Sequence, residues 1–188
     1  LVVGVIHGDE RAGLRILDAI GSRVPDPASL AGTQLWLIPT INPDGSRLDT
    51  RKNARGVDLN RNFPYRWRGG LPRSHGYYPG PRPASEPETK AVIRFVRQIQ
   101  PDLSIWYHQP WGAVLACRGR PRLGAEYATL VAMRTSCRGK GARGTAISWE
   151  THAVPGSTAF VVELGPRALS GRAADRHARA ALALAGGG

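Results

Sequence analysis

Short apolar runs alternate with longer amphipathic stretches along this chain, and the alternation starts at the first residue. Residues 1–6 are apolar and partly β-branched, which predicts a buried strand. We expect a helix over residues 10–20, a loop with two prolines over 21–32 and a second strand over 33–39, closed by a proline. A strand, a helix and a strand at this spacing indicate a βαβ unit in an α/β sheet.

The next predicted helix starts near residue 85. Ser85 can serve as its N-cap, Glu88 completes a capping box, and Pro87 lies in the first turn, where its missing N–H costs nothing. The later elements predicted from the pattern are a strand over 102–107, a helix over 123–136, a strand over 158–165 and a helix over 166–184.

Two stretches, residues 41–84 and 139–156, have no apolar period and are expected to be irregular. An irregular segment as long as the first of these is normally functional or disordered in a compact domain. Within it, Asn42-Pro43-Asp44-Gly45 is a strong turn signal.

Ionisable side chains stand at or near the ends of the apolar strands: His7, Glu10, His108 and Glu163. In an open, largely parallel sheet, ligands bind beyond the carboxyl ends of the strands, so these side chains can converge. Histidine and glutamate suit zinc, and a catalytic zinc ion takes three protein ligands and a water. The residues alone leave other readings open. His7 can cap a helix, Glu10 can be a first-turn carboxylate, and Glu163 can pair with an arginine at a sheet edge.

Length and composition narrow the class of protein. The 188 residues are predicted to form a single domain, 1–188, and no apolar run is long enough to span a membrane. The formal charge of +12 comes from 26 basic residues against 14 acidic ones, but the arginines are scattered and no nucleic-acid-binding motif is present. We therefore expect neither nucleic acid nor a membrane as partner. The two cysteines, Cys117 and Cys137, allow one disulfide or two free thiols.

The motifs, taken in order, resemble those of the zinc carboxypeptidase (M14) family, in particular its compact bacterial branch of murein peptide amidases. They are His7-x-x-Glu10, Asn42-Pro43-Asp44-Gly45, the Gly-Val-Asp-Leu-Asn-Arg-Asn segment over 56–62, His108 and Val162-Glu163-Leu164. The resemblance implies a single-domain, three-layer α/β/α fold with a mixed, largely parallel twisted sheet. The chain starts inside a predicted strand, without Met or a signal-peptide pattern, so we expect a fold truncated at the N-terminus.

The resemblance also implies the metal centre and the acid–base group. His7, Glu10 and His108 would bind one zinc ion (Zn²⁺). Glu163 would be the general base and acid. The chemistry of a carboxylate beside a zinc-activated water agrees with that role, because the carboxylate can take the proton and pass it to the leaving amine.

Substrate contacts follow from the same resemblance. Arg51 matches the arginine that polarises the scissile carbonyl, although Arg47 and Arg55 are near alternatives, and Asn60 and Arg61 match the pair that grips the terminal carboxylate. Larger digestive members carry a mobile tyrosine upstream of the catalytic glutamate, but residues 139–162 contain no tyrosine. His152 lies in that segment, and we expect it to supply a hydrogen-bond donor over the substrate.

The expected activity is zinc-dependent hydrolysis of a peptide or amide bond next to a free carboxylate, with bacterial cell-wall (murein) peptides as candidate substrates. The alternatives are a zinc deacylase of small N-acyl amino acids, of the aspartoacylase and desuccinylase type, and a module that binds peptides without cutting them. A monomer, secreted or in the cell envelope, is favoured.

Overall fold

The computed structural model describes residues 1–24, 30, 32–116, 121–138 and 141–186. In this part of the chain, six strands form one sheet in the order β2-β1-β3-β6-β4-β5. The strands are β1 (Val2–Val5), β2 (Leu37–Thr40), β3 (Leu103–His108), β4 (Ala113–Leu115), β5 (Arg134–Ser136) and β6 (Thr158–Glu163). Strand β4 runs antiparallel to β6, and all other neighbours are parallel. The prediction of a mixed, largely parallel sheet is confirmed.

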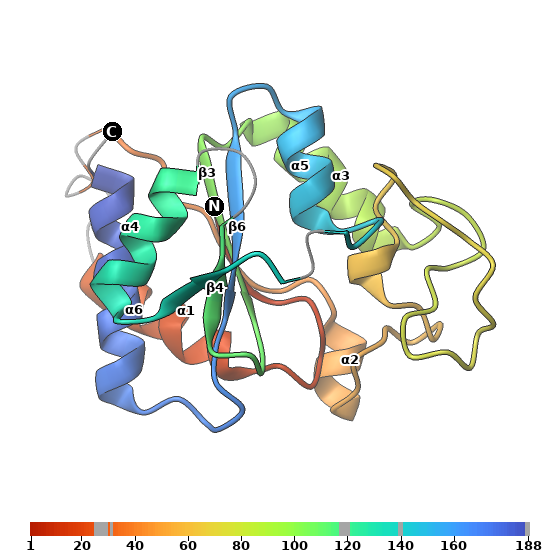
Figure 1. Ribbon diagram of the computed structural model, residues 1–188, viewed down its shortest axis with the longest axis horizontal. Helices are drawn as coiled ribbons and strands as arrows, with labels where there is room; N and C mark the ends of the chain where they lie inside the picture. The colour runs from red at the N-terminus through yellow and green to blue at the C-terminus, as the bar shows by residue number, and fades with distance from the viewer. Residues whose placement is uncertain (25–29, 31, 117–120, 139–140, 187–188) are drawn as a thin grey trace.

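Helices cover both faces of the sheet (Figure 1). Helices α1 (Ala12–Arg23), α4 (Pro121–Val131) and α6 (Gly171–Gly186) lie together on one face, while α3 (Pro87–Ile99) and α5 (Ala146–Ala153) lie on the other. The predicted three-layer arrangement is therefore confirmed. A short helix, α2 (Pro43–Leu48), and a 3-10 turn (Leu59–Arg61) interrupt the long loops beside the second face. None of the described helices has the length and apolarity needed to cross a membrane.

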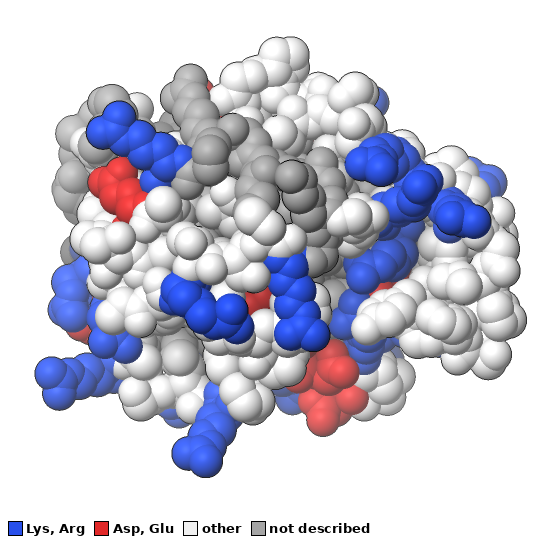
Figure 2. Space-filling view, in the orientation of Figure 1, with Lys and Arg blue, Asp and Glu red and all other residues white. Residues whose placement is uncertain are grey.

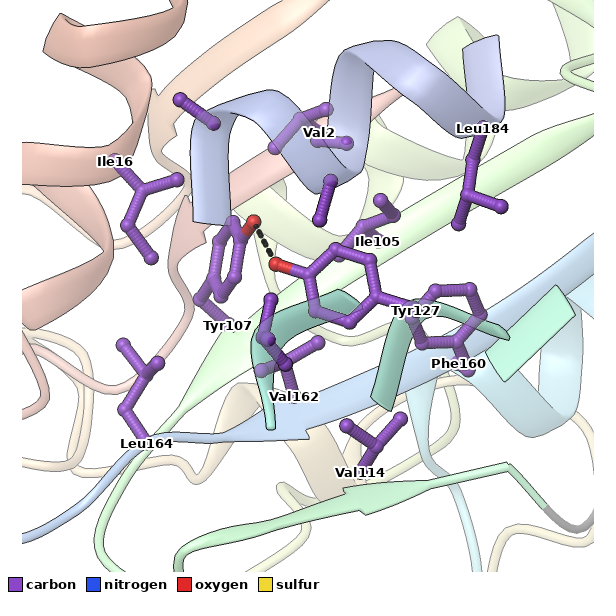
Figure 3. Close-up of a cluster of buried hydrophobic side chains, with 14 of the residues drawn as sticks. Val2, Ile16, Ile105, Tyr107, Val114, Tyr127, Phe160, Val162, Leu164 and Leu184 are labelled. Atoms are coloured by element: carbon purple, nitrogen blue, oxygen red, sulfur yellow. Dashed lines mark hydrogen bonds between the residues drawn. The ribbon is translucent and has the colours of Figure 1, made fainter. Parts of the chain in front are cut away.

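The core under α1, α4 and α6 contains a row of hydrogen-bonded polar side chains among its apolar ones (Figure 3). The hydroxyls of Tyr107 and Tyr127 lie 2.7 Å apart, and the Tyr127 hydroxyl lies 2.9 Å from His177 Nδ1. Burial raises the pKa of both tyrosines and lowers the pKa of His177 to about 4. These three polar groups thus satisfy one another inside the core, with a neutral imidazole.

Several predicted boundaries are wrong. The helix predicted over 123–136 ends at Val131, where Ala132 takes a left-handed backbone conformation (φ 56°), and β5 follows. The stretch over 139–156 is not irregular throughout, because it contains α5. The pattern also missed β4, which has only three residues, too few to show a period. Pro39 lies within β2, and this is tolerated because β2 is an edge strand.

The start of α3 also differs from the prediction. The N-cap is Glu86, no side chain caps the helix, and Pro87 is its first residue. Ser85 does not cap the helix, because its hydroxyl donates a hydrogen bond to Glu86 Oε1 (2.7 Å). Glu88 accepts a hydrogen bond from Asn53 Nδ2 (3.1 Å) instead of completing a capping box. Contacts with the 50–62 segment therefore override the local capping pattern.

Candidate metal centre and active site

The side chains predicted at strand ends meet at one edge of the sheet. His7 and Glu10 lie in the turn that follows β1, where the Glu10 N–H donates to His7 O (3.0 Å). His108 ends β3 and Glu163 ends β6, and the parallel register sets these two residues side by side. Because β3 lies between β1 and β6 in the sheet, the carboxyl ends of all three strands come together.

His7, Glu10 and His108 form a compact, buried donor set. Their candidate ligand atoms all lie within 4.8 Å of one another. Glu10 Oε1 lies 2.9 Å from His7 Nδ1, and Glu10 Oε2 lies 2.8 Å from His108 Nδ1. Burial alone would raise the pKa of Glu10, but hydrogen bonds from the two imidazoles outweigh it and lower that pKa well below its usual range. Two imidazole nitrogens and one ionised carboxylate are a donor set that fits a catalytic zinc ion.

Asp58 lies behind this donor set, and no pattern in the sequence assigned it a role. It is fully buried, and its Oδ1 lies 3.2 Å from His7 Nε2. A carboxylate on that nitrogen favours the tautomer that leaves the lone pair of His7 Nδ1 free for a metal. Burial opposes the charge of Asp58, but the hydrogen bond from His7 and the charges of His7, Arg51 and Arg61 lower its pKa well below the usual range.

Arg51 is held by the same aspartate. Its Nε and Nη2 donate to Asp58 Oδ2 at 3.0 and 2.8 Å, and its Nη1 donates to Glu10 Oε1 at 3.3 Å. The guanidinium therefore lies directly beside the candidate metal ligands and lines the cavity in front of them. Of the three arginines considered from the sequence, Arg51 is the one brought to the site, since neither Arg47 nor Arg55 lines that cavity.

Asn60 and Arg61 line the same cavity, next to α5. Asn60 Oδ1 accepts a hydrogen bond from the Ala146 N–H (3.0 Å), and Arg61 Nη1 donates to the Asn60 carbonyl (2.7 Å). The ring of Tyr77, which the sequence analysis did not single out, lies 5.0 Å from the guanidinium carbons of both Arg51 and Arg61. Tyr77 comes from a loop without an apolar period, so no sequence signal marked it.

Glu163 faces the cavity beside the donor set. Burial raises its pKa to about 7, the nearby charge of Glu10 adds to the effect, and the Trp111 backbone N–H opposes it. Glu163 Oε2 is buried and has no hydrogen-bond partner within the described ranges. The carboxyl group can therefore exchange a proton near neutral pH through an oxygen that no protein donor occupies.

His152 is not brought to the site. It is exposed, it is not among the residues that line the cavity, and its ring stacks on Tyr65 with the centroids 4.0 Å apart. It lies on α5, so the helix that the sequence pattern missed turns this side chain away. Cys137 lines the cavity and is disulfide-bonded, while Cys117 lies outside the described residues.

Comparisons with known proteins show which chains this one is similar to. The zinc carboxypeptidase family profile matches residues 22–116. The chain is 37% identical over 134 residues to murein peptide amidase A of Escherichia coli K12, covering 65% of this chain and 52% of that protein. It is 32% identical over 143 residues to the carboxypeptidase N catalytic chain of Mus musculus, covering 61% of this chain and 31% of that one. The chain thus spans about half, or less, of the length of these curated relatives.

Solved structures extend the likeness to almost the whole chain. The murein-tripeptide amidase of Escherichia coli O157 superimposes with a TM-score of 0.76 and 28% identity, over 97% of this chain and 78% of that one. Bovine thrombin-activatable fibrinolysis inhibitor gives a TM-score of 0.75 at 21% identity, over 97% of this chain and 78% of that one, which supports the fold alone.

Proposed function

The chain belongs to the zinc carboxypeptidase family, and from this we propose that it is a zinc-dependent hydrolase that cleaves a peptide or amide bond next to a free carboxylate. The observation that carries the proposal is the buried His7, Glu10 and His108 donor set, whose ligand atoms lie within 4.8 Å of one another. These three residues would hold the ion. Bound zinc supplies a Lewis acid that acidifies water and polarises a carbonyl group.

Side chains of the protein carry out proton transfer, polarisation of the carbonyl group and binding of the terminal carboxylate. Glu163, with a pKa raised to about 7 by burial, accepts a proton from the attacking water and returns it to the leaving amine nitrogen. Arg51, oriented by Asp58, donates to the scissile carbonyl oxygen as negative charge develops there. Asn60 and Arg61 bind the terminal carboxylate, because an amide and a guanidinium that line the same cavity can both donate to it.

Cell-wall peptides are the proposed substrates. The support is the likeness to murein peptide amidases, at 37% identity for one curated relative and 28% for one solved structure. An excess of basic residues on the surface suits anionic material, and on the face drawn in Figure 2 blue side chains outnumber red ones and gather over the loops of residues 50–84. A single zinc ion and a monomer complete the proposal.

The test combines metal content with hydrolysis. Metal is measured by mass spectrometry, and cleavage of a γ-D-glutamyl-diaminopimelate peptide is followed for the wild type and Glu163→Gln. We expect one equivalent of zinc in both proteins and a roughly 100- to 10,000-fold lower kcat in the variant, because it lacks the acid–base group. Glu126→Gln, which removes an exposed carboxylate on α4, is the matched control and should behave as the wild type.

Other results would redirect the proposal. Zinc without peptide cleavage, together with hydrolysis of an N-acyl amino acid, would identify a deacylase. Zinc with activity on neither substrate class would leave a peptide-binding module. Absence of zinc would mean that the donor set does not hold the ion.

A further inference from the structure

A third arginine lines the active-site cavity, besides Arg51 and Arg61, which were given roles above. Trp111 and Arg138 both line the cavity, and the guanidinium carbon of Arg138 lies 4.6 Å from the centre of the Trp111 ring. Trp111 follows β3 by three residues, whereas Arg138 follows β5 by two. The contact therefore joins the loop between β3 and β4 to the segment that follows β5.

The pair is anchored close to the proposed acid–base group. The Trp111 backbone N–H lies near enough to the Glu163 carboxyl to lower its pKa, and the Trp111 carbonyl accepts a hydrogen bond from Arg134 Nη2 (3.1 Å). The Trp111 backbone is thus held between Glu163 and β5. A ligand group held at Arg138 would therefore lie in the same cavity as the bond to be cleaved.

The guanidinium of Arg138 is available to a ligand. A stacked guanidinium uses its face against the aromatic ring and keeps its in-plane N–H donors free. Within the ranges that the structure describes, no carboxylate pairs with Arg138 and no group accepts a hydrogen bond from its side chain. Arg51, by contrast, already donates to two carboxylates.

The charge balance of the cavity favours a second anion. Among the described residues that line the cavity, the only carboxylates are Glu10 and Glu163, against three arginines, Arg51, Arg61 and Arg138. Glu10 accepts hydrogen bonds from His108 and Arg51. A substrate with one terminal carboxylate would engage Asn60 and Arg61 and leave Arg138 without an anion.

We propose that Arg138, stacked on Trp111, forms a second carboxylate-binding subsite, so that the preferred substrate carries a carboxylate besides its terminal one. This inference rests on the proposed function. The second carboxylate can belong to the residue on the acyl side of the cleaved bond or to the side chain of the leaving residue. The chemistry at Arg138 is the same in both cases, a guanidinium facing a carboxylate.

Three peptides distinguish the two sources. The reference is L-alanyl-γ-D-glutamyl-diaminopimelate. Amidation of the α-carboxylate of its glutamyl residue removes the anion on the acyl side, and lysine in place of diaminopimelate removes only the side-chain carboxylate of the leaving residue. We expect one of the two changes to lower kcat/KM of the wild type about tenfold, mainly through a higher KM.

The variant Arg138→Gln should abolish that discrimination, bringing the ratio of kcat/KM between the reference and the affected peptide close to one. Arg138→Lys should retain part of it, because the charge stays but the planar donor pair is lost. Arg143→Gln is the matched control, since Arg143 is exposed in the same loop region and does not line the cavity. Its ratio should equal that of the wild type. An unchanged ratio in Arg138→Gln, or no preference in the wild type, would overturn the inference.

Binding measurements separate this inference from the proposed function. Calorimetric titration of Glu163→Gln with the same peptides needs no turnover. Suppose that the wild type cleaves no peptide, but Glu163→Gln binds the reference peptide about tenfold more tightly than the affected peptide. If the double variant Glu163→Gln/Arg138→Gln binds both peptides equally, the subsite stands and the hydrolase proposal fails. Cleavage of all three peptides at equal kcat/KM would leave the hydrolase and overturn the subsite.

Discussion

At the scale of single residues, Asp58 couples two parts of the site. Its Oδ1 faces His7 Nε2 at 3.2 Å, while its Oδ2 accepts from Arg51 Nη2 at 2.8 Å. One buried carboxylate thus orients both a candidate metal ligand and a candidate oxyanion donor. Removing its charge should therefore affect metal binding and catalysis together.

We predict that Asp58→Asn lowers zinc affinity about 10- to 100-fold, because an amide cannot favour the same His7 tautomer as strongly as a carboxylate. Competition with a chromophoric chelator measures the affinity. Asp44→Asn is the control, since that carboxylate pairs with Arg47 at the surface of α2 and should leave zinc binding unchanged. Equal affinity of wild type and Asp58→Asn would contradict the orienting role.

Glu163 should also make the stability of the metal-free protein depend on pH. Its pKa is raised from 4.5 to about 7, so the folded state binds a proton more tightly than the unfolded state. The contribution of Glu163 to stability is therefore greatest below about pH 4.5 and is lost as the pH rises through 7. This shift of the Glu163 pKa corresponds to at most about 3 kcal/mol of unfolding free energy.

The variant Glu163→Gln should not lose this stability at high pH, because glutamine carries no ionisable carboxyl group. In the presence of a chelator, urea denaturation should give a higher free energy of unfolding for Glu163→Gln than for the wild type at pH 8, with a smaller difference at pH 5. If the difference is the same at both pH values, the carboxyl group does not titrate as its burial implies.

At the scale of elements, the turn after β1 is fixed by close packing against α2. A Cβ on Gly8 would lie only 2.0 Å from the carbonyl carbon of Gly45, so the two backbones meet where no side chain fits. Asn42 caps α2 by accepting from the Gly45 N–H (3.0 Å), and its Nδ2 donates to the carbonyls of Ile6 and Arg51 (both 3.2 Å). The Asn-Pro-Asp-Gly motif therefore holds β1, α2 and the Arg51 segment together.

We predict that Asn42→Ala destabilises the protein by about 2–4 kcal/mol, since it removes a cap and leaves one buried and one partly buried carbonyl without their donor. Thr145→Ala is the comparison, because Thr145 also caps a helix, α5, by accepting from the Ser148 N–H. That change should cost only about 1 kcal/mol. Urea denaturation of both variants checks this, and equal losses would mean that the bonds to Ile6 and Arg51 contribute little.

At the scale of the whole molecule, the buried Tyr107, Tyr127 and His177 chain links the central strand β3 to α4 and α6. Burial lowers the pKa of His177 from 6.5 to about 4. The unfolded state therefore binds the proton first as the pH falls. The contribution of neutral His177 to the free energy of unfolding is fully present above about pH 6.5. It is lost as the pH drops toward 4, and the loss is at most about 3 kcal/mol.

His177→Gln should flatten this dependence, because glutamine does not titrate but can still face the Tyr127 hydroxyl. The measurement is the free energy of unfolding at pH 7 and 4.5, and the wild type should lose more than the variant. His75→Gln, a change at an exposed histidine, should keep the wild-type dependence. A parallel loss in wild type and His177→Gln would show that other groups govern acid sensitivity.

The sequence by itself determined the fold class and the residues at strand ends. Apolar runs that stop at a histidine or glutamate are readable from local composition, and in a parallel sheet the carboxyl ends of neighbouring strands share one edge. This is why His7, Glu10, His108 and Glu163 could be grouped before any contact was known. The structure brings these residues together as the pattern implied.

Only the tertiary structure decided the rest. Asp58, Tyr77 and the Trp111–Arg138 pair lie in loops without a hydrophobic period, so their partners are set by contacts between distant segments. His152 was misjudged because a helix of eight residues, α5, turns it onto Tyr65. Periodicity reports which face of an element is buried, whereas the direction of a loop side chain depends on packing that no local pattern encodes.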